Sequence, residues 1–412
     1  MGRSGGMAQQ LPWLIAGAGI AGLAAAIGLA RHGHRVHVLE RRAALSEIGA
    51  GIQIGPNGVK ALGALGLRQA VEQVADRPDS IGVYLGRTGG RLTTLPLGAS
   101  MQQRHGVPYL TLLRADLQSV LLKAARDQPG VTLELGFDLA GIAQTTDSVS
   151  ARASDGRILT GVGLIGADGL WSQVRALQGD GAPPPSGMAA FRALLPRNQC
   201  GADRLPTPFF ANDVGIWLGS DAHVVHYPVG GGSLLNLVVI VKSAPGAEGW
   251  DEPGGLADLS PHLAGWPAAL LAVLQQAPDW RRWHLFERPA ARSWSDGRIL
   301  CIGDAAHPVL PFLAQGAVLA LEDAAVLAGL LGPANGDPAA VLARFEHLRR
   351  PRTDRVAAAS RRNAAAYHLR GPAALARNGV LRVTPPALLL GQYDWLYGYD
   401  PREVAGVASI RR

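Results

Sequence analysis

The residues best suited to chemistry lie between two apolar segments near position 304. Residues 299–302 have the pattern of a short buried strand, and Gly303 and Asp304 follow it with a carboxylate beside a flexible turn. Gly316 then precedes the apolar run 317–321, which predicts a helix. The amides and dipole at a helix N-terminus stabilise negative charge. We expect this strand end and helix start to hold a polyol and an electron-poor ring; taken alone, the Gly-Asp pair could equally be a plain turn.

A second chemical motif lies near the N-terminus, where Gly17, Gly19 and Gly22 form a G-x-G-x-x-G pattern between a strand-like segment and the predicted helix 20–31. The first glycine permits a tight turn, the second lets a pyrophosphate approach the backbone, and the third lets the helix pack on the strand. Glu40 ends the next predicted strand, where an acid can hydrogen-bond ribose hydroxyls. The pattern predicts a site for an adenine dinucleotide.

A third segment offers acid–base groups. On a strand, His223, Val225 and Tyr227 point to one face and His226 to the other. An imidazole can accept a proton, and a tyrosine hydroxyl can donate a hydrogen bond to a polar group of a ligand. An ordinary core histidine and tyrosine are the alternative for this pair. We expect His226 to be structural or exposed.

The elements that must position these groups alternate between strands and helices at both ends of the chain. The patterns predict a helix at 114–126, paired strands at 131–142 and 149–159 with a turn at Asp155-Gly156, a β-rich region at 188–242, and helices from 319 onward. The chain of 412 residues is long enough for two domains. Because the dinucleotide motifs flank the β-rich region, we predict an α/β fold with a discontinuous first domain. The predicted units are a cofactor domain (8–80, 105–180 and 295–340), a substrate domain (81–104 and 181–294) and a C-terminal helical region (341–412).

Composition excludes several classes of protein. The net charge of +7 is spread along the chain rather than gathered with aromatics, which argues against a nucleic-acid-binding protein. Two cysteines are too few for a disulfide framework and are typical of a cytoplasmic protein with reduced thiols. The most apolar stretch, 14–30, is interrupted by the glycines of the fingerprint, so we expect no membrane span. We also expect no metal site.

The motifs together resemble those of a known family. Gly166-Ala167-Asp168-Gly169, continuing through Ser172 to Arg175, is another strand–turn–helix motif. With the glycine fingerprint and the stretch from Gly303-Asp304 to Asp323, it resembles the single-component FAD-dependent aromatic hydroxylases over nearly the whole chain. The most similar types are 3-hydroxybenzoate 6-hydroxylase, salicylate hydroxylase and 6-hydroxynicotinate 3-monooxygenase. The resemblance implies a Rossmann-like FAD-binding domain of the p-hydroxybenzoate hydroxylase type, a β-sheet substrate domain and C-terminal helices.

The resemblance also implies roles for individual residues. FAD contacts are implied for Gly17, Gly19, Gly22, Glu40, Arg41, Arg114, Asp168, Asp304, Gln315 and Gly316. Asp168 and Arg175 belong to a stretch linked in the family to both FAD and NAD(P)H, with a turn and an ion pair as the alternative. Catalytic roles are implied for His223, Tyr227 and Gln53, and a substrate pocket for Val214, Val225, Pro311 and Phe312.

The activity implied is hydroxylation of a small phenol or hydroxylated aromatic acid, with NADH or NADPH and O2 as co-substrates and a flavin C4a-hydroperoxide as the oxygen donor. Decarboxylation would accompany it if the substrate is salicylate-like. Pro311 and Phe312 replace polar residues of the hydroxybenzoate 6-hydroxylase and hydroxynicotinate types, which argues against 3-hydroxybenzoate and 6-hydroxynicotinate as substrates. The alternatives are a monooxygenase of a larger natural-product aromatic, a non-hydroxylating flavin reductase and a flavin-binding sensor. Resemblance alone also suggests a homodimer formed through the C-terminal helices.

Overall fold

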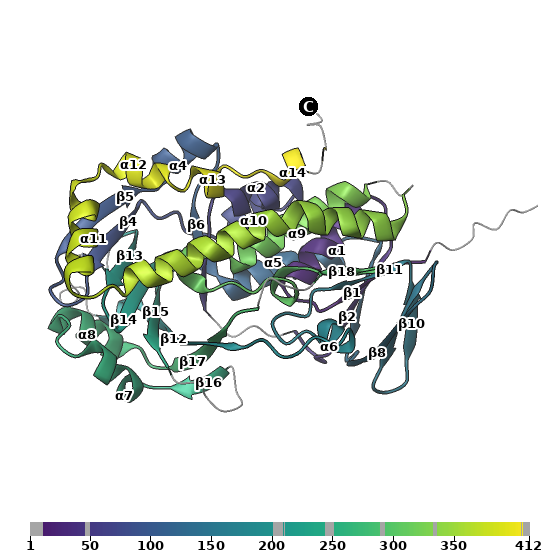
Figure 1. The fold of residues 1–412 in the computed structure, drawn as a ribbon, viewed down its shortest axis with the longest axis horizontal. Helices are drawn as coiled ribbons and strands as arrows, with labels where there is room; N and C mark the ends of the chain where they lie inside the picture. The colour runs from purple at the N-terminus through teal and green to yellow at the C-terminus, as the bar shows by residue number, and fades with distance from the viewer. Residues whose placement is uncertain are drawn as a thin grey trace, which may run out of the picture.

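The computed structural model describes residues 11–45, 50–200, 209, 211–243, 251–288, 293–332, 336–404 and 406. Within these residues the elements gather around two large sheets, and the long helix α10 (Pro338–Tyr367) runs across both (Figure 1). Parts of each predicted domain range lie outside the described residues, and the boundaries between the domains stay predictions.

The first large sheet is formed by six short strands whose parallel part is buried. Five of the strands are parallel, and only the edge strand β18 is antiparallel to its neighbour β19. Across the sheet the order is β18 (Ser295–Asp296), β19 (Ile299–Cys301), β11 (Gly163–Gly166), β1 (Trp13–Ala16), β2 (Val36–Glu40) and β7 (Val131–Leu135). Because parallel strands end at a common edge, the turns that follow β2, β1, β11 and β19 lie side by side.

Helices cover this sheet and fix the motifs at its edge. The Ala- and Leu-rich helix α1 (Ile20–Arg31) packs against α9 (Gly316–Leu331) and α5 (Arg114–Arg126). The segment 20–31 and the segment 114–126 are helical with the predicted bounds. In Figure 1 the purple α1 and the green α9 lie next to each other although they are far apart in the sequence.

One prediction for this region is wrong. The segment 131–142 is not one strand, because Gly136 adopts a left-handed conformation (φ 68°) and turns the chain. Its first half is β7 of the parallel sheet, and its second half begins a separate antiparallel sheet. That sheet contains β8 (Leu139–Gln144), β9 (Val149–Ala153) and β10 (Ile158–Gly161).

The second large sheet has eight strands and is antiparallel except where β13 meets β4. Its order is β16 (Asp251–Gly254), β17 (Trp280–Phe286), β12 (Pro185–Pro196), β15 (Leu234–Lys242), β14 (Ala222–Val229), β13 (Asp213–Leu218), β4 (Ser80–Leu85) and β5 (Arg91–Pro96). One face, which includes Val224 and Leu237, forms a core with α7 (Leu256–Leu259) and α8 (Ala268–Gln276). The opposite face carries His223 and Tyr227 and is called here the His–Tyr face.

The remaining elements surround the two large sheets. α10 begins at a cap in which Asp337 accepts a hydrogen bond from the Ala339 amide, and its 30 residues span about 45 Å. No helix among the described residues is both long and apolar enough to cross a membrane. The other elements are β3 (Gly51–Ile54), α2 (Pro56–Ala64), α3 (Arg68–Glu72), α4 (Gly98–His105), β6 (Leu110–Leu113), α6 (Gln173–Leu177), α11 (Gly371–Val383), α12 (Pro386–Gly391), α13 (Asp394–Tyr397) and α14 (Pro401–Val404).

Candidate active site

The glycine fingerprint forms an open backbone cradle at the end of β1. Gly17 has φ +100°, and a Cβ there would lie 2.6 Å from the Ala167 carbonyl oxygen. A Cβ at Gly22 would overlap the Gly17 carbonyl, so only glycine lets α1 start this close to the strand. A Cβ at Gly19 would meet nothing within 4 Å, which leaves its backbone open to a ligand. These positions fit a pyrophosphate at the N-terminus of α1.

Two charged residues flank the cradle. Glu40 accepts hydrogen bonds from the amides of Ala18 (2.9 Å) and Arg42 (2.9 Å), which fixes its carboxylate at the end of β2. Arg41 is exposed beside it. The carboxylate therefore lies where a ribose joined to a pyrophosphate in the cradle would follow.

Asp304 and Gly316 come together at the end of β19. A Cβ built on Gly316 would lie 3.9 Å from Asp304 Oδ1. The Asp304 side chain is accessible to solvent but surrounded by protein on most sides, and this burial raises the pKa of its carboxyl while Arg114 and His307 oppose the rise. The Gln315 side chain is buried, where its oxygen accepts a hydrogen bond from Asn57 (2.8 Å). At this position only the backbone of residues 315 and 316 can face a ligand.

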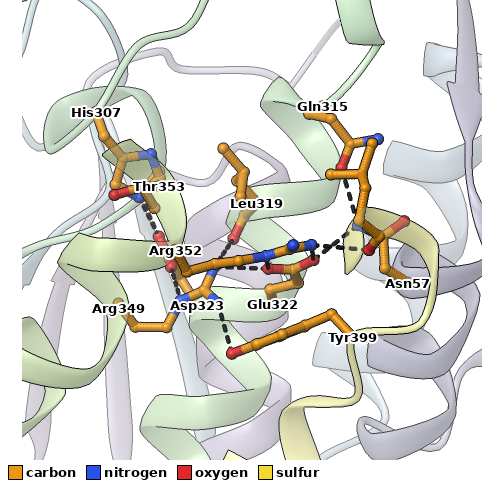
Figure 2. Close-up of polar contacts among 12 residues, drawn as sticks. Asn57, His307, Gln315, Leu319, Glu322, Asp323, Arg349, Arg352, Thr353 and Tyr399 are labelled. Carbon is orange, nitrogen blue, oxygen red and sulfur yellow. Dashed lines mark hydrogen bonds and ion pairs between the residues drawn. The ribbon is translucent and has the colours of Figure 1, made fainter. Parts of the chain in front are cut away.

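A buried ionic network holds this turn from behind (Figure 2). Asp323 accepts hydrogen bonds from the Gly303 amide (2.9 Å), His307 Nε2 (2.6 Å) and Arg349 Nε (2.8 Å). Burial acts to raise the pKa of Asp323, but His307 and Arg349 outweigh it and the pKa falls to about 2. The carboxylate thus fixes the backbone that carries Asp304.

The neighbouring acid, Glu322, ties the start of α9 to the C-terminal helices. It accepts hydrogen bonds from Asn57 (2.8 Å) and Arg352 (2.9 Å) and forms an ion pair with Arg349 (2.9 Å). Arg349 also donates to the Tyr399 hydroxyl (2.7 Å), as Figure 2 shows. Sequence patterns gave no sign of this network, because its members are separated by up to 342 positions, from Asn57 to Tyr399.

Asp168 and Arg175 follow β11 at the same edge. Asp168 accepts a hydrogen bond from the Val174 amide (3.1 Å), and burial raises the pKa of its carboxyl. Arg175 is buried, where it donates to the carbonyls of Ala305 and Ala306 and pairs with Asp180. Arg175 therefore joins the ends of β11 and β19, while its ion pair with Asp180 links residues only five positions apart and is not the domain-bridging pair considered as the alternative.

A cationic cavity of about 490 Å³ lies beside this junction. Its basic lining residues are Arg175, Arg288, His307, Arg350 and Arg361, against the acids Asp180 and Asp354. Burial, with Arg175 nearby, lowers the pKa of Arg288. Such a lining favours an anionic ligand beside the ends of β11 and β19.

The His–Tyr face has the predicted orientation. His223, Val225 and Tyr227 lie on it, and Val214 on β13 is buried in the same cluster as Tyr227. His226 points to the other face, where its ring is buried and its centroid lies 4.5 Å from that of Phe209. Of the two predictions for His226, a structural role therefore holds and exposure to solvent does not.

Two tyrosines and a glutamine lie together beside this face. The Tyr109 hydroxyl donates to Gln53 Oε1 (2.8 Å), and Gln53 lies near Tyr227. Burial raises the pKa of Tyr227 to about 12, with Arg192 and Gln53 opposing the rise. The Tyr227 hydroxyl can donate a hydrogen bond to a ligand.

His223 lies in an aromatic cluster at the other end of the face. Its ring centroid is 5.0 Å from that of Phe312 and 5.3 Å from that of Tyr367, and Pro311 precedes Phe312 in a short 3-10 turn. Burial lowers the pKa of His223 to about 3, and His368 adds to that lowering. At neutral pH the imidazole is therefore uncharged, and its nitrogen without a hydrogen can accept a hydrogen bond.

Arg192 is the residue of this face that sequence reasoning missed. It pairs with Val238 across β15, which in turn pairs with Val225, so Arg192 lies two strands from the row between His223 and Tyr227. Its guanidinium lies 4.3 Å from the Trp283 ring, and among the described residues no carboxylate pairs with it. Burial lowers its pKa to about 10 while Tyr227 opposes the change. The only sign of it in the sequence is an arginine in an otherwise apolar strand, on the same predicted face as Ala190 and Leu194.

Comparisons with known proteins agree with this geometry. A family model described as FAD binding domain matches residues 10–360. The chain is 36% identical to 3-hydroxybenzoate 6-hydroxylase 1 of Aquipseudomonas alcaligenes over 95% of this chain and 98% of that protein. It is 38% identical to a 3-amino-4-hydroxybenzoate 2-monooxygenase of Streptomyces platensis over 95% and 96%. A substrate complex of salicylate hydroxylase superposes with a TM-score of 0.82 at 26% identity, covering 98% of this chain and 99% of that one.

Proposed function

The chain belongs to the FAD-binding-domain family of flavin-dependent aromatic monooxygenases, and we propose that it hydroxylates a small hydroxylated benzoic acid with electrons from NADH or NADPH. The observation that carries the choice of substrate is Arg192. Arg192 is a half-buried cation without a carboxylate partner among the described residues, and an anionic ligand on the His–Tyr face would stabilise it. The names of the two relatives and of the salicylate hydroxylase all contain a hydroxylated benzoate, which supports the same class.

FAD, when bound and reduced, supplies the activation of dioxygen. The chain's own residues would hold it through the glycine cradle, Glu40 and the turn at Asp304 and Gly316. The network of Asp323 and Glu322 keeps that turn in one geometry, so the ring would meet a preorganised helix N-terminus.

The substrate is positioned and activated by groups at three places on the His–Tyr face. Arg192 would bind the carboxylate, Tyr227 would donate to an oxygen of the ring, and neutral His223 would accept the phenol proton. Removing that proton makes the ring more electron-rich, which is what attack by an electrophilic oxygen requires. Apolar Phe312 and Val214 would exclude water from the ring.

The apolar pair Pro311 and Phe312 still argues against 3-hydroxybenzoate and 6-hydroxynicotinate. Phe312 contacts His223 with its ring and offers no hydrogen bond from its side chain. We therefore favour a substrate whose polar groups are satisfied by His223, Tyr227 and Arg192 alone, such as salicylate or an amino-substituted hydroxybenzoate. Decarboxylation belongs to this proposal only for a substrate with its hydroxyl next to the carboxylate.

We infer that the nicotinamide cofactor docks at the cationic cavity. Its diphosphate is the anion that Arg175, Arg288 and Arg361 would attract, and the cavity includes His307 from the turn after β19.

A homodimer through the C-terminal helices stays a prediction. Leu375, Val383 and Leu388 on α11 and α12 have exposed fractions of 72%, 79% and 64%, which supports the idea of a covered apolar surface. A solution mass of twice 43.0 kDa would agree with it, and a mass of 43.0 kDa would exclude it.

His223→Ala tests the proposed chemistry. The variant should bind FAD normally but lose hydroxylation by about 100-fold or more, because a positioned base contributes on that order. His347→Ala, an exposed histidine on α10, is the matched control and should behave as the wild type. Unchanged turnover in His223→Ala would return His223 to a purely structural role, and oxidation of NAD(P)H without any oxygenated product would indicate a flavin reductase.

A further inference from the structure

We propose that Asn236 is a positioning residue that fixes the hydroxyl of Tyr227 where the aromatic acid binds; this rests on the proposed function. Asn236 lies on β15 directly opposite Tyr227 on β14, and both side chains are buried on the His–Tyr face. Side chains opposite each other on neighbouring antiparallel strands lie close enough to contact. Asn236 acts on the Tyr227 ring through a third element, the strand β3, which packs against both side chains.

The contact between Asn236 and β3 is made by Gly51. The Gly51 amide donates a hydrogen bond to Asn236 Oδ1 (2.7 Å), and the two residues are 185 positions apart. A backbone amide can only donate, so the side-chain oxygen of Asn236 must face Gly51, which fixes the orientation of the side-chain amide. The Nδ2 of Asn236 is buried and has no hydrogen-bond partner among the described residues. Within that part of the chain, the bond to Gly51 is therefore the one hydrogen bond of this side chain.

Gly51 also packs against the Tyr227 ring. A Cβ built on Gly51 would lie 2.6 Å from Asn236 Cγ and 2.7 Å from Tyr227 Cε2, which is closer than real Cβ atoms approach. The backbone of β3 therefore lies directly against both side chains, and only a glycine permits this approach. Contact with β3 limits the Tyr227 ring on one side, and the bond to Asn236 keeps β3 in that place.

A second buried hydrogen bond anchors the same pair of strands. β3 pairs with β6, and Gln53 on β3 lies opposite Thr111 on β6. The Thr111 hydroxyl donates to the carbonyl of Pro228 (2.8 Å), the residue after Tyr227 on β14. The two strands are thus attached to β15 at Asn236 and to β14 at Pro228. A substitution of Asn236 should therefore loosen the Gly51 end of β3, beside the Tyr227 ring, while the Thr111 bond keeps the strands attached.

The test measures the dissociation constant of an aromatic acid from the FAD-loaded enzyme, by the change that the acid makes in the flavin absorbance. The probe is whichever of salicylate and 3-amino-4-hydroxybenzoate binds the wild type more tightly. Tyr227→Phe should raise the dissociation constant about 10-fold, as expected for the loss of one hydrogen bond. Asn236→Leu has a side chain of similar size but offers no acceptor to Gly51. It should raise the dissociation constant by a similar factor, because the displaced Tyr227 hydroxyl no longer meets the acid.

The double variant separates positioning of Tyr227 from general damage. Adding Asn236→Leu to Tyr227→Phe should change the dissociation constant by less than about 3-fold, because the hydroxyl that Asn236 positions is already absent. Asn212→Leu is the matched control. It breaks an exposed hydrogen bond of the same kind, from an asparagine side chain to the backbone of a distant segment at Arg77, and should bind the acid as the wild type does.

Two outcomes would overturn the proposal. An unchanged dissociation constant in a folded Asn236→Leu with normal FAD content would show that the Gly51 bond does not position Tyr227. A rise of about 10-fold in both the wild-type and the Tyr227→Phe backgrounds would show that Asn236 acts by another route. If Asn236→Leu fails to fold, Asn236→Ala, which adds no bulk, is measured in both backgrounds and judged in the same way.

Failure of this inference is distinguishable from failure of the proposed function. If the wild type binds and hydroxylates neither acid, the proposed function fails and the inference fails with it. If Tyr227→Phe binds the acid as the wild type does, the role of Tyr227 in the proposed function fails. If Tyr227→Phe weakens binding and Asn236→Leu does not, only the inference about Asn236 fails.

Discussion

The substitution Arg192→Met should remove the preference of the enzyme for aromatic acids. Strands are spaced by about 4.8 Å, so the backbone of Arg192 lies about 10 Å from β14. Its guanidinium stacks on Trp283 of β17, on the far side of β12, and would have to turn toward β14 to come within about 5 Å of a carboxylate held between His223 and Tyr227. At that distance two unit charges interact by about 3 kcal/mol with an effective dielectric constant of about 20. Desolvation of the carboxylate reduces the net effect, so we expect about 2 kcal/mol, or roughly 30-fold.

The assay is the ratio of kcat/KM for a hydroxybenzoate to kcat/KM for the phenol that lacks only the carboxylate. The ratio should fall about 30-fold in Arg192→Met, and it cancels losses that affect both substrates equally, such as a lower content of folded enzyme. Arg282→Met is the matched control, since Arg282 lies on the opposite face of the sheet in an ion pair with Glu252 and should leave the ratio unchanged. A ratio within 3-fold of wild type in Arg192→Met would refute the assignment of Arg192 to the carboxylate.

Four further predictions follow from the geometry. Gly19→Ala should leave the fold intact, because the added Cβ meets no protein atom within 4 Å. It should weaken FAD binding at least 10-fold in a fluorescence titration, because the Cβ would occupy the place where a pyrophosphate approaches. The control Gly63→Ala, at an equally unobstructed position on α2, should bind FAD normally. Arg288→Met should raise KM for NAD(P)H several-fold and leave KM for the aromatic acid unchanged; the reverse pattern would place the nicotinamide cofactor elsewhere. Asp323→Asn should cost about 3–5 kcal/mol of unfolding free energy at pH 7, since it leaves a buried Arg349 underpaired. The pKa of Asp323 is lowered in the folded protein to about 2, below its value in the unfolded chain. The stability that the carboxylate contributes is therefore present above about pH 4 and is lost as the pH falls to about 2. In denaturant titrations, the difference in unfolding free energy between wild type and Asp323→Asn should shrink by about 2 kcal/mol over that range. Ala314→Gly should stabilise the protein by about 1 kcal/mol, because Ala314 has φ 52°, a conformation that glycine adopts without strain; a lower denaturation midpoint would contradict this.

What could be predicted from the sequence is what depends on neighbours along the chain. The strand–turn–helix motifs at Gly17, Asp168 and Asp304 appear at the expected edge because each needs only a local pattern and a parallel sheet. Alternation also gave the correct face to His223 and Tyr227. The single strand predicted for 131–142 failed because one glycine turned the chain, which apolar periodicity does not register.

The residues that were missed depend on contacts distant in sequence. His368 is 145 positions from His223, and the partners of Glu322 come from α2 and α10. An arginine on α10 has the same appearance in sequence whether it is solvated or, like Arg349, fully buried between two acids. Arg192 alternates with apolar residues, but nothing in a single sequence distinguishes a face that receives a ligand from one that packs on a helix.

The measurement that tests the central claim most directly is product analysis under ¹⁸O2. The FAD-loaded enzyme is given NADH or NADPH and a series of salicylate, amino-substituted hydroxybenzoates, other hydroxybenzoates and carboxylate-free phenols. We predict that at least one aromatic acid stimulates NAD(P)H oxidation and yields a product with one ¹⁸O atom, in preference to the matching phenol. Oxidation of NAD(P)H that yields only peroxide with every aromatic acid, or oxygenation of carboxylate-free rings alone, would contradict the account.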